Sequence, residues 1–304
     1  MTDVSAVTIA PPRTFATKVG AFVALTKPRI IELLLVTTVP TMIVAERGMP
    51  AGWLIVLTVV GGTLAAGGAN TFNMYVDRDI DALMDRTKNR PLVTGAVQPR
   101  QALVFGFVLE IAAFALLWAG VNLLSAALAV SATLFYVFIY TLWLKRTSRQ
   151  NIVIGGAAGA APVLIGWSAV TNELAIEPWV LFALIFLWTP PHFWALAIKY
   201  ADDYRAADVP MMPVVESARN TAIQMIAYTV LVAGVGSAFG PVAGLGWIYG
   251  IAAGVAGLVF LAHTTMLLKD PSAKRAMKVF GYSITYLTVV FVAMAVDILV
   301  VEGF

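Results

Sequence analysis

The chain has no cysteine and few charged residues. Of its 304 residues only 12% are charged and 60% are hydrophobic, and the mean hydropathy is +0.85. The lack of cysteine excludes disulfides, thiolate metal sites and cysteine nucleophiles, so any chemistry must use oxygen and nitrogen groups. The shortage of charge excludes an ordinary soluble domain with a solvated exterior. We therefore expect an all-α membrane protein that lipid covers over most of its surface.

The N-terminus lacks the apolar run of a secretory signal. Residues 1–25 mix charged residues with Pro11 and Pro12, whereas a mitochondrial presequence would usually be richer in Arg and Ser. We predict that residues 1–25 form a short, disordered cytoplasmic tail. Residues 26–304 are expected to form a single transmembrane domain in a bacterial inner membrane.

Nine apolar stretches are long enough to cross a bilayer as helices, which takes roughly 20 residues each. Cytoplasmic loops retain positive residues, so sorting Lys and Arg by loop tests this division. All of the 20 Lys and Arg residues except Arg47 fall on one side. This predicts a cytoplasmic N-terminus and makes the net charge of +3 a topology signal, not a sign of nucleic-acid binding. The predicted spans are about 30–46, 51–76, 101–119, 121–143, 151–170, 178–200, 221–240, 244–267 and 279–301.

Carboxylates gather at one end of the second predicted span. Asn73, Asp77 and Asp81 recur every four residues, and on a helix this spacing puts them on one stripe roughly 80° wide. Oxygen ligands without sulfur or clustered His suit Mg²⁺, which usually also binds substrate phosphates. The neighbouring residues that could contact a diphosphate are Arg86, Lys88 and Arg90.

A second acidic cluster, Asp202 and Asp203, follows the sixth predicted span. It lies on the same side of the membrane four spans later, so spans one to four and five to eight are consistent with parallel repeats that share a site. A charged helix end is commonly a solvated cap with internal ion pairs. Two such clusters on one face favour a metal and phosphate site instead.

These residues resemble the signature motifs of the UbiA-type intramembrane prenyltransferases. Asn73-xxx-Asp77-xxx-Asp81 is similar to the first aspartate-rich motif of that family. Asp202 and Asp203, with the string VPMMPV that follows shortly after them, are similar to the second. We identify the chain by this resemblance as a UbiA-type protein.

Two longer strings resemble one branch of the family, whose members farnesylate haem. They are DRTKNRPL at 85–92 and WTPPHFWAL at 188–196. The resemblance covers nearly the whole chain, from Thr26 to the ninth span. It implies a nine-helix bundle with a cytoplasmic active site, in which Mg²⁺ lies between a prenyl diphosphate and the aspartates.

The haem branch implies a defined reaction. Farnesyl diphosphate alkylates the 2-vinyl group of haem B, water supplies a hydroxyl group, and haem O and diphosphate leave. The implied partners are these two substrates, the lipid bilayer and a haem A synthase or terminal oxidase assembly, with no nucleic acid. The superfamily often has Asp where this chain has Lys199, which leaves the ligands of a second metal open.

Site residues follow from the resemblance position by position. The implied metal ligands are Asn73, Asp77 and Asp81 for one ion and Asp203, with Asp202, for the other. The implied catalytic residues are Asp77, Asp81, Asp203 and His192, and the implied diphosphate contacts are Arg29, Arg86, Lys88, Arg90, Tyr140, Lys145, Lys199 and Arg205.

Several other residues of the predicted spans are open to two interpretations. His192 follows Pro190 and Pro191, which should interrupt the sixth span, and it is assigned to haem contact or proton transfer. Phe135, Tyr136, Phe193 and Trp194 either line the cavity or pack in the bundle. Acids within spans mark function by default, although no partner is evident for Glu32, Glu110 or Asp297, and the role of His263 is equally open.

Three other functions fit some of these features. A secondary transporter also has repeats, broken spans and buried acids, but its charges would lie near the bilayer midplane, whereas the main clusters here lie at one face. A structural assembly subunit would not need two carboxylate clusters. A prenyltransferase for a quinone precursor or a chlorin is the main rival, and only the string TPPH at 189–192 argues against it.

Overall fold

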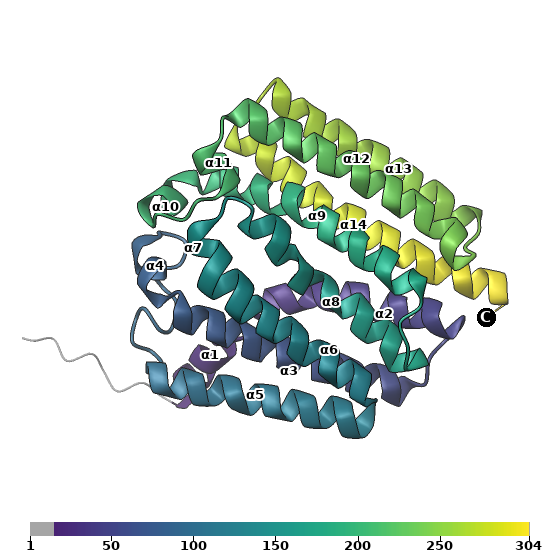
Figure 1. Ribbon diagram of the computed structural model, residues 1–304, viewed down its shortest axis with the longest axis horizontal. Coiled ribbons are helices and arrows are strands. Elements are labelled where there is room, and N and C mark those ends of the chain that lie inside the picture. The colour runs from purple at the N-terminus through teal and green to yellow at the C-terminus, as the bar shows by residue number, and fades with distance from the viewer. Residues whose placement is uncertain (1–14, 304) are drawn as a thin grey trace, which may run out of the picture.

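Every regular element in the described part of the chain is a helix. The computed structural model describes the backbone of residues 15–303, and the side chains of residues 17–28 and 36–303. Figure 1 shows the long helices packed side by side as one bundle. They are α2 (Pro28–Glu46), α3 (Gly52–Val76), α5 (Pro99–Gly120), α6 (Leu123–Leu134), α8 (Asn151–Thr171), α9 (Ile176–Lys199), α12 (Ala218–Ala243), α13 (Trp247–Thr265) and α14 (Ala273–Glu302).

The shorter elements lie at helix ends and in loops. They are α1 (Phe15–Leu25), α4 (Arg78–Leu83), the π-helix η1 (Phe135–Leu144), α7 (Lys145–Thr147), α10 (Ala201–Ala206), α11 (Met212–Val215) and the 3₁₀ turn η2 (Met266–Leu268).

Eight helices of the described residues are long and apolar enough to cross a membrane. They coincide with the second to ninth predicted spans, because long uninterrupted apolar runs leave no alternative to helix in lipid. The first predicted span corresponds to α2, whose apolar segment is Val36–Glu46. The all-α membrane fold is therefore confirmed, whereas the count of nine spans and the cytoplasmic N-terminus stay predictions.

Part of the expected N-terminal tail is helical. Residues 15–25 form α1, so the expectation of a disordered tail was wrong for them, and residues 1–14 lie outside the described residues. The helix is held by apolar contacts: Leu25 is fully buried, and the ring of Phe22 packs edge-on against Phe105 of α5 at 5.1 Å. The apolar side chains of α1, such as those of Phe22 and Leu25, are the sequence feature that indicates this packing.

The two prolines of α9 do not interrupt it. The helix runs unbroken from Ile176 to Lys199 through Pro190 and Pro191, which corrects the expected break. Just before the prolines, the hydroxyl of Thr189 donates to the carbonyl of Ile185 (2.8 Å). Neighbouring helices that pack on both sides can hold a proline-containing helix together in a membrane.

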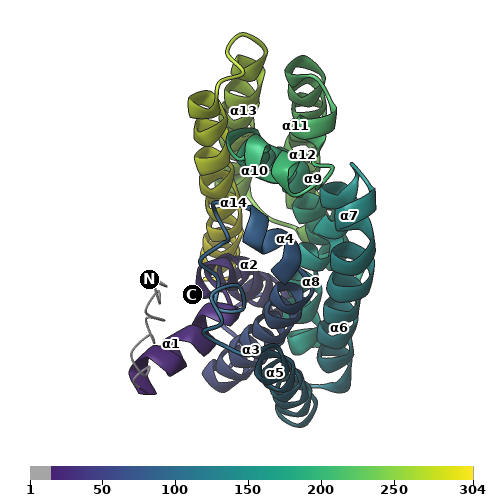
Figure 2. The ribbon, with the colours of Figure 1, turned by 90° about the vertical axis from the view of Figure 1, so that its left-hand side faces the viewer.

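The two acidic clusters lie at the same end of the bundle. In Figure 1, α4, α7 and α10 gather at the left, and the C-terminus lies at the opposite end. Figure 2 looks onto that end and shows α4 and α10 near its centre. This arrangement agrees with the equivalent positions that the sequence predicts for the clusters.

Asp297 has a structural partner near the opposite end. Its carboxylate is fully buried and accepts hydrogen bonds from the backbone N–H groups of Gly246 (2.5 Å) and Tyr249 (2.9 Å). These groups belong to the first turn of α13, where backbone donors lack partners within the helix. Asp297 of α14 therefore caps α13.

Replacing Asp297 with alanine should lower the free energy of unfolding by about 3 kcal/mol, because two buried backbone donors lose a charged acceptor. Denaturation of the purified protein in detergent measures this change. Glu173, exposed in a loop, provides the control: Glu173→Ala should be neutral. Equal stability of the two variants would contradict the capping role.

Candidate functional site

A cavity of about 340 Å³ extends into the bundle from the end that carries α4 and α7. Its deep part is lined by small and apolar residues of α3, α6 and α8, including Ala65, Ala69, Ala129, Gly159 and Ile165. Its polar end is lined by Lys27, Asn73, Arg86, Arg90, Tyr140 and Lys145. The cavity thus combines an apolar interior with a strongly cationic mouth.

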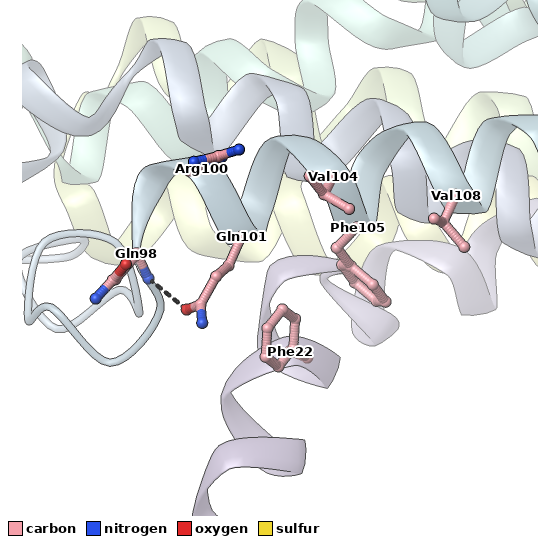
Figure 3. Close-up of a pocket in the computed structure, with 7 residues that line it drawn as sticks. All are labelled: Phe22, Gln98, Arg100, Gln101, Val104, Phe105 and Val108. Carbon is pink, nitrogen blue, oxygen red and sulfur yellow. Dashed lines mark hydrogen bonds between the residues drawn. The ribbon is translucent and has the colours of Figure 1, made fainter.

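A shallow groove lies on the outside of the bundle. Figure 3 shows it where α1 meets the start of α5, with the rings of Phe22 and Phe105 facing each other between the two helices. Its volume is about 450 Å³, but the described residues that line it include no carboxylate. Gln98 and Gln101 bond to each other's backbone as a capping box for α5. The candidate site is therefore the cavity, not this groove.

The ladder of Asn73, Asp77 and Asp81 forms as the spacing predicts. Helical hydrogen bonds continue through the junction of α3 and α4, from Asp77 N to Asn73 O (2.9 Å) and from Asp81 N to Asp77 O (2.8 Å). All three side chains are buried, and Asn73 Nδ2 donates to Asp77 Oδ2 (2.8 Å). Asp79 points the other way, and its hydrogen bonds from Arg146 lower its pKa to about 2. The ladder is thus an oxygen-rich stripe inside the protein.

Each residue of the ladder is bonded to a cation. Lys145 donates to Asp77, and Arg90 Nη1 lies 2.7 and 2.6 Å from the two carboxylate oxygens of Asp81. Lys27 Nζ donates to Asn73 Oδ1 at 2.7 Å. The Lys145–Asp77 and Arg90–Asp81 ion pairs are almost fully buried. The charges of these two aspartates are therefore balanced by neighbouring cations inside the protein.

Lys27 is a site residue that sequence reasoning missed. It joins α1 to α2 with a left-handed backbone (φ 52°), and this turn directs its side chain into the cavity. Burial, followed by the charges of Arg90 and Lys145, holds the pKa of Lys27 well below its usual value. The signal was present in the sequence, because the residue before a proline such as Pro28 is kept out of the α-helical region and marks a turn.

The π-helix η1 shapes one wall of the cavity. Its wider turn lets the hydroxyl of Thr141 donate to the carbonyl of Tyr136 (2.8 Å) while accepting from Asn73 Nδ2 (3.1 Å). The rings of Tyr136 and Tyr140 stack at 5.4 Å and face the cavity. Lys145 follows directly and reaches Asp77. Segments of π-helix often occur at functional sites.

The second cluster meets the first across the mouth of the cavity. Asp203 Oδ2 accepts the backbone N–H of Arg86 at 3.1 Å, which joins α10 to the loop after α4. The guanidinium of Arg86 lies 3.4 Å from the hydroxyl of Tyr204 and over the ring of Tyr200. The two acidic helix ends therefore lie together, as the shared-site prediction requires.

Other predicted contacts lie at the surface near this mouth. Asp202 pairs with Arg205 (2.5 Å), and Lys88 pairs with Asp85 (2.6 Å), with all four side chains more than half exposed. Lys199 Nζ lies over the ring of Tyr200 at 5.0 Å. None of Lys88, Lys199, Asp202 and Arg205 is in the described cavity wall, and of the predicted metal ligands only Asn73 lines it. Their predicted roles, and those of the other site residues, stay predictions.

The ladder provides too few ligands to hold a Mg²⁺ ion unless a bound substrate supplies the others. No group of three Asp, Glu or His among the described residues is close enough to hold a metal. The buried Asp77 Oδ1 has no hydrogen-bond partner, however, although Arg146 Nη2 lies 3.8 Å from it, and carboxylate oxygens are ligands that Mg²⁺ prefers. The residues therefore fit an ion that completes its coordination with water and phosphate oxygens.

His192 is buried beside the cavity and held by α14. Its ring stacks between Trp188 (4.2 Å) and Phe280 (4.5 Å). Ser283 Oγ donates to the carbonyl of Phe280 (2.6 Å), so it accepts from His192 Nδ1 at 2.7 Å. This places a proton on Nδ1.

The remaining predicted residues divide between the cavity and the bundle. Tyr136 and Phe193 line the cavity, whereas Phe135 and Trp194 are absent from the described wall, and Trp194 packs against Tyr228. His263 stacks on Tyr282 at 4.9 Å. The side chains of Arg29 and Glu32 lie outside the described residues.

Comparison with known proteins gives consistent results. Residues 34–293 match the model of the UbiA prenyltransferase family. A protoheme IX farnesyltransferase of Pseudarthrobacter chlorophenolicus is 54% identical over 93% of this chain and 90% of its own length.

Two solved structures share the fold at low sequence identity. One, of a digeranylgeranylglyceryl phosphate synthase, has a TM-score of 0.76 at 18% identity and covers 92% of this chain and 98% of its own. The other is a UbiA homolog from Archaeoglobus fulgidus bound to GPP and Mg²⁺. It has a TM-score of 0.63 at 18% identity and covers 90% of this chain and 99% of its own.

Proposed function

The chain belongs to the UbiA prenyltransferase family, and from this premise we propose that it transfers a farnesyl group from farnesyl diphosphate to the 2-vinyl group of haem B. Water addition then gives haem O, and diphosphate leaves. The relatives of about half identity that carry the name protoheme IX farnesyltransferase support this acceptor over a quinone precursor or a chlorin. Membership of a prenyltransferase family likewise speaks against the transporter and assembly-subunit alternatives.

The single observation that carries this proposal is the cationic mouth of an apolar cavity, where the lining cations Arg90 and Lys145 pair with the ladder behind them. Lys27, Arg90 and Lys145 converge there with Arg86 and Tyr140, and such groups bind diphosphate oxygens well. The apolar interior below them suits a farnesyl chain. The amphipathic substrate and the cavity thus share the same division into a charged and an apolar end.

The same cations help the diphosphate to leave. As the allylic C–O bond breaks, negative charge grows on the diphosphate, and fixed positive groups stabilise that charge in a site with little water. We infer that Asn73, Asp77 and Asp81 hold Mg²⁺, with Asp203 beside it, and that this ion supplies further neutralisation of the leaving group. The solved relative with GPP and Mg²⁺ supports a metal-dependent reaction.

The cavity wall protects the allylic cation. Tyr136, Phe193 and the small residues of α3 and α8 exclude water from the reacting carbon. Electron-rich rings such as that of Tyr136 also attract a nearby cation. We place His192 at the haem side of the cavity, since Trp188 and Phe193, which flank it, line the wall.

We further propose that the site faces the cytoplasm of a bacterial inner membrane. Lys and Arg residues gather at the end that carries the cavity mouth, whereas Arg47 lies near the opposite end, where it pairs with Glu302 (2.8 Å). A haem A synthase or terminal oxidase assembly would then receive the product. The clustering of basic residues on one side is the support for this orientation.

A direct assay tests the function. Purified protein with Mg²⁺, haem B and farnesyl diphosphate should yield haem O, detected by mass spectrometry, and diphosphate in equal amount. Quinone precursors and chlorins serve as competing acceptors. Transfer to one of them, with none to haem in the same preparation, would refute the proposed acceptor.

Lys27→Met should raise KM for farnesyl diphosphate about 10- to 100-fold, because a buried hydrogen-bond donor to the diphosphate is lost. Steady-state kinetics with haem B held in excess measures this change. Lys274→Met removes the same charge from an exposed position at the start of α14, and it should leave KM unchanged. A KM within twofold of the wild type in Lys27→Met would show that Lys27 does not contact the substrate.

A further inference from the structure

Glu110 lies near the middle of α5 and is bonded toward the cavity. The hydroxyl of Thr133, on α6, donates to Glu110 Oε1 at 3.1 Å. Thr133 itself lines the cavity. Among the described residues, no Lys or Arg pairs with Glu110. A carboxylate inside a span without a cation is costly, and such groups usually serve a function.

The helix α3 makes room for this carboxylate. A Cβ atom on Gly68 would lie 2.6 Å from Glu110 Oε1 and 2.9 Å from its Cγ, so the carboxylate packs against α3 at a position where a larger residue would displace it. Gly68 precedes Asn73 by five residues, or roughly 8 Å along the helix. The same five residues turn the helix by roughly 140° beyond a full turn, and neither Gly68 nor Glu110 is in the described cavity wall. Glu110 therefore reaches the cavity through Thr133.

The proposed reaction releases one proton. When the bond from farnesyl carbon to diphosphate oxygen breaks, the allylic cation takes the electron pair of the vinyl group and forms a new C–C bond. The cation now on the vinyl carbon next to the porphyrin accepts a lone pair from water, which forms a C–O bond. The oxonium must then lose a proton to give the alcohol. Without a base for water, the same cation loses a C–H proton and becomes an alkene.

We propose that Glu110, acting through the hydroxyl group of Thr133, accepts the proton of the water that adds to the farnesylated vinyl group. This inference rests on the function proposed above. The water donates to Thr133 Oγ1, and the Thr133 proton moves along its existing hydrogen bond to Glu110. Thr133 is then the residue that touches the water, and Glu110 is a positioning residue and final acceptor. The pair decides whether the product is an alcohol or an alkene.

The test separates water addition from farnesyl transfer. Wild type, Glu110→Gln, Thr133→Val and Thr133→Ser are assayed with Mg²⁺, haem B and farnesyl diphosphate. Diphosphate release reports transfer, and mass spectrometry distinguishes the alcohol from the alkene, which is lighter by one water. Ser131→Ala, on the same helix but exposed and bonded to the carbonyl of Ala127, is the matched control.

In Glu110→Gln and Thr133→Val, alcohol formation should fall about 100-fold, and alkene should replace it while diphosphate release continues. Thr133→Ser and Ser131→Ala should give the alcohol. An unchanged alcohol fraction in Glu110→Gln or Thr133→Val overturns the proposal, as does loss of alcohol in Thr133→Ser. If Glu110→Gln does not fold, the two Thr133 variants decide alone. Failure of the wild type to farnesylate haem would instead refute the proposed function.

Discussion

Replacing Asp77 with asparagine is expected to lower kcat for farnesyl transfer by at least about 1,000-fold. Asp77 is fully buried at the centre of the ladder, and its Oδ1 is the one oxygen there without a hydrogen-bond partner. An amide in its place has no charge to hold Mg²⁺, so the diphosphate would leave with its charge poorly neutralised. Single-turnover assays with haem B and farnesyl diphosphate measure the rate.

The matched control for Asp77→Asn is Asp79→Asn. Asp79 lies two residues away on the same helical stretch, but it is more than half exposed and pairs with Arg146 outside the cavity. Its replacement should leave kcat within a few-fold of the wild type. Thermal unfolding in detergent must confirm that both variants are folded. A folded Asp77→Asn variant with more than a tenth of wild-type activity would exclude this residue as a metal ligand.

Removal of divalent metal should abolish transfer and leave the protein folded. The reaction would stop because the diphosphate loses the ion that neutralises it. The fold should persist because Lys145 and Arg90 already balance Asp77 and Asp81. The experiment compares protein treated with EDTA and the same protein after Mg²⁺ is restored, by haem O formation and by circular dichroism.

The two readouts of the metal experiment are independent. Haem O should disappear with EDTA and return with excess Mg²⁺, whereas helical content should stay constant throughout. Continued transfer in EDTA would refute the metal requirement. Unfolding in EDTA would instead show that a metal holds the two acidic helix ends together, a role the cation pairs at the ladder make unnecessary.

The long helices could be predicted from the sequence because their signal is continuous. Apolar runs such as those of α3 and α9 fix an element by length and hydropathy alone. The failures are local and have local causes. Helix α1 has only 11 residues, so its apolar contacts with α5 were not visible without the partner. The prolines of α9 suggested a break that packing against neighbouring helices prevents.

The chemistry of the site could be predicted only where helix geometry links residues. A spacing of four placed Asn73, Asp77 and Asp81 on one face, and the structure has them there. Helix periodicity does not predict where the side chains of loops and connections point. Lys88 and Asp202, which follow helix ends, point outward, whereas Lys27 enters the cavity from the connection between α1 and α2. Loop paths depend on tertiary contacts that spacing does not encode.

The π-helix η1 gives the chain a change of phase within one span. Its wider turns rotate every later residue about the helix axis relative to α6. The side chains that face lipid before Phe135 therefore lie on a different face of the helix from Thr141 and Lys145. One continuous helix can therefore anchor in the membrane on one side and hold Asp77 on the other. Gain or loss of one residue in this segment would turn Lys145 by roughly 100°. Evolution should consequently tolerate changes of side chain in η1 far better than changes of length.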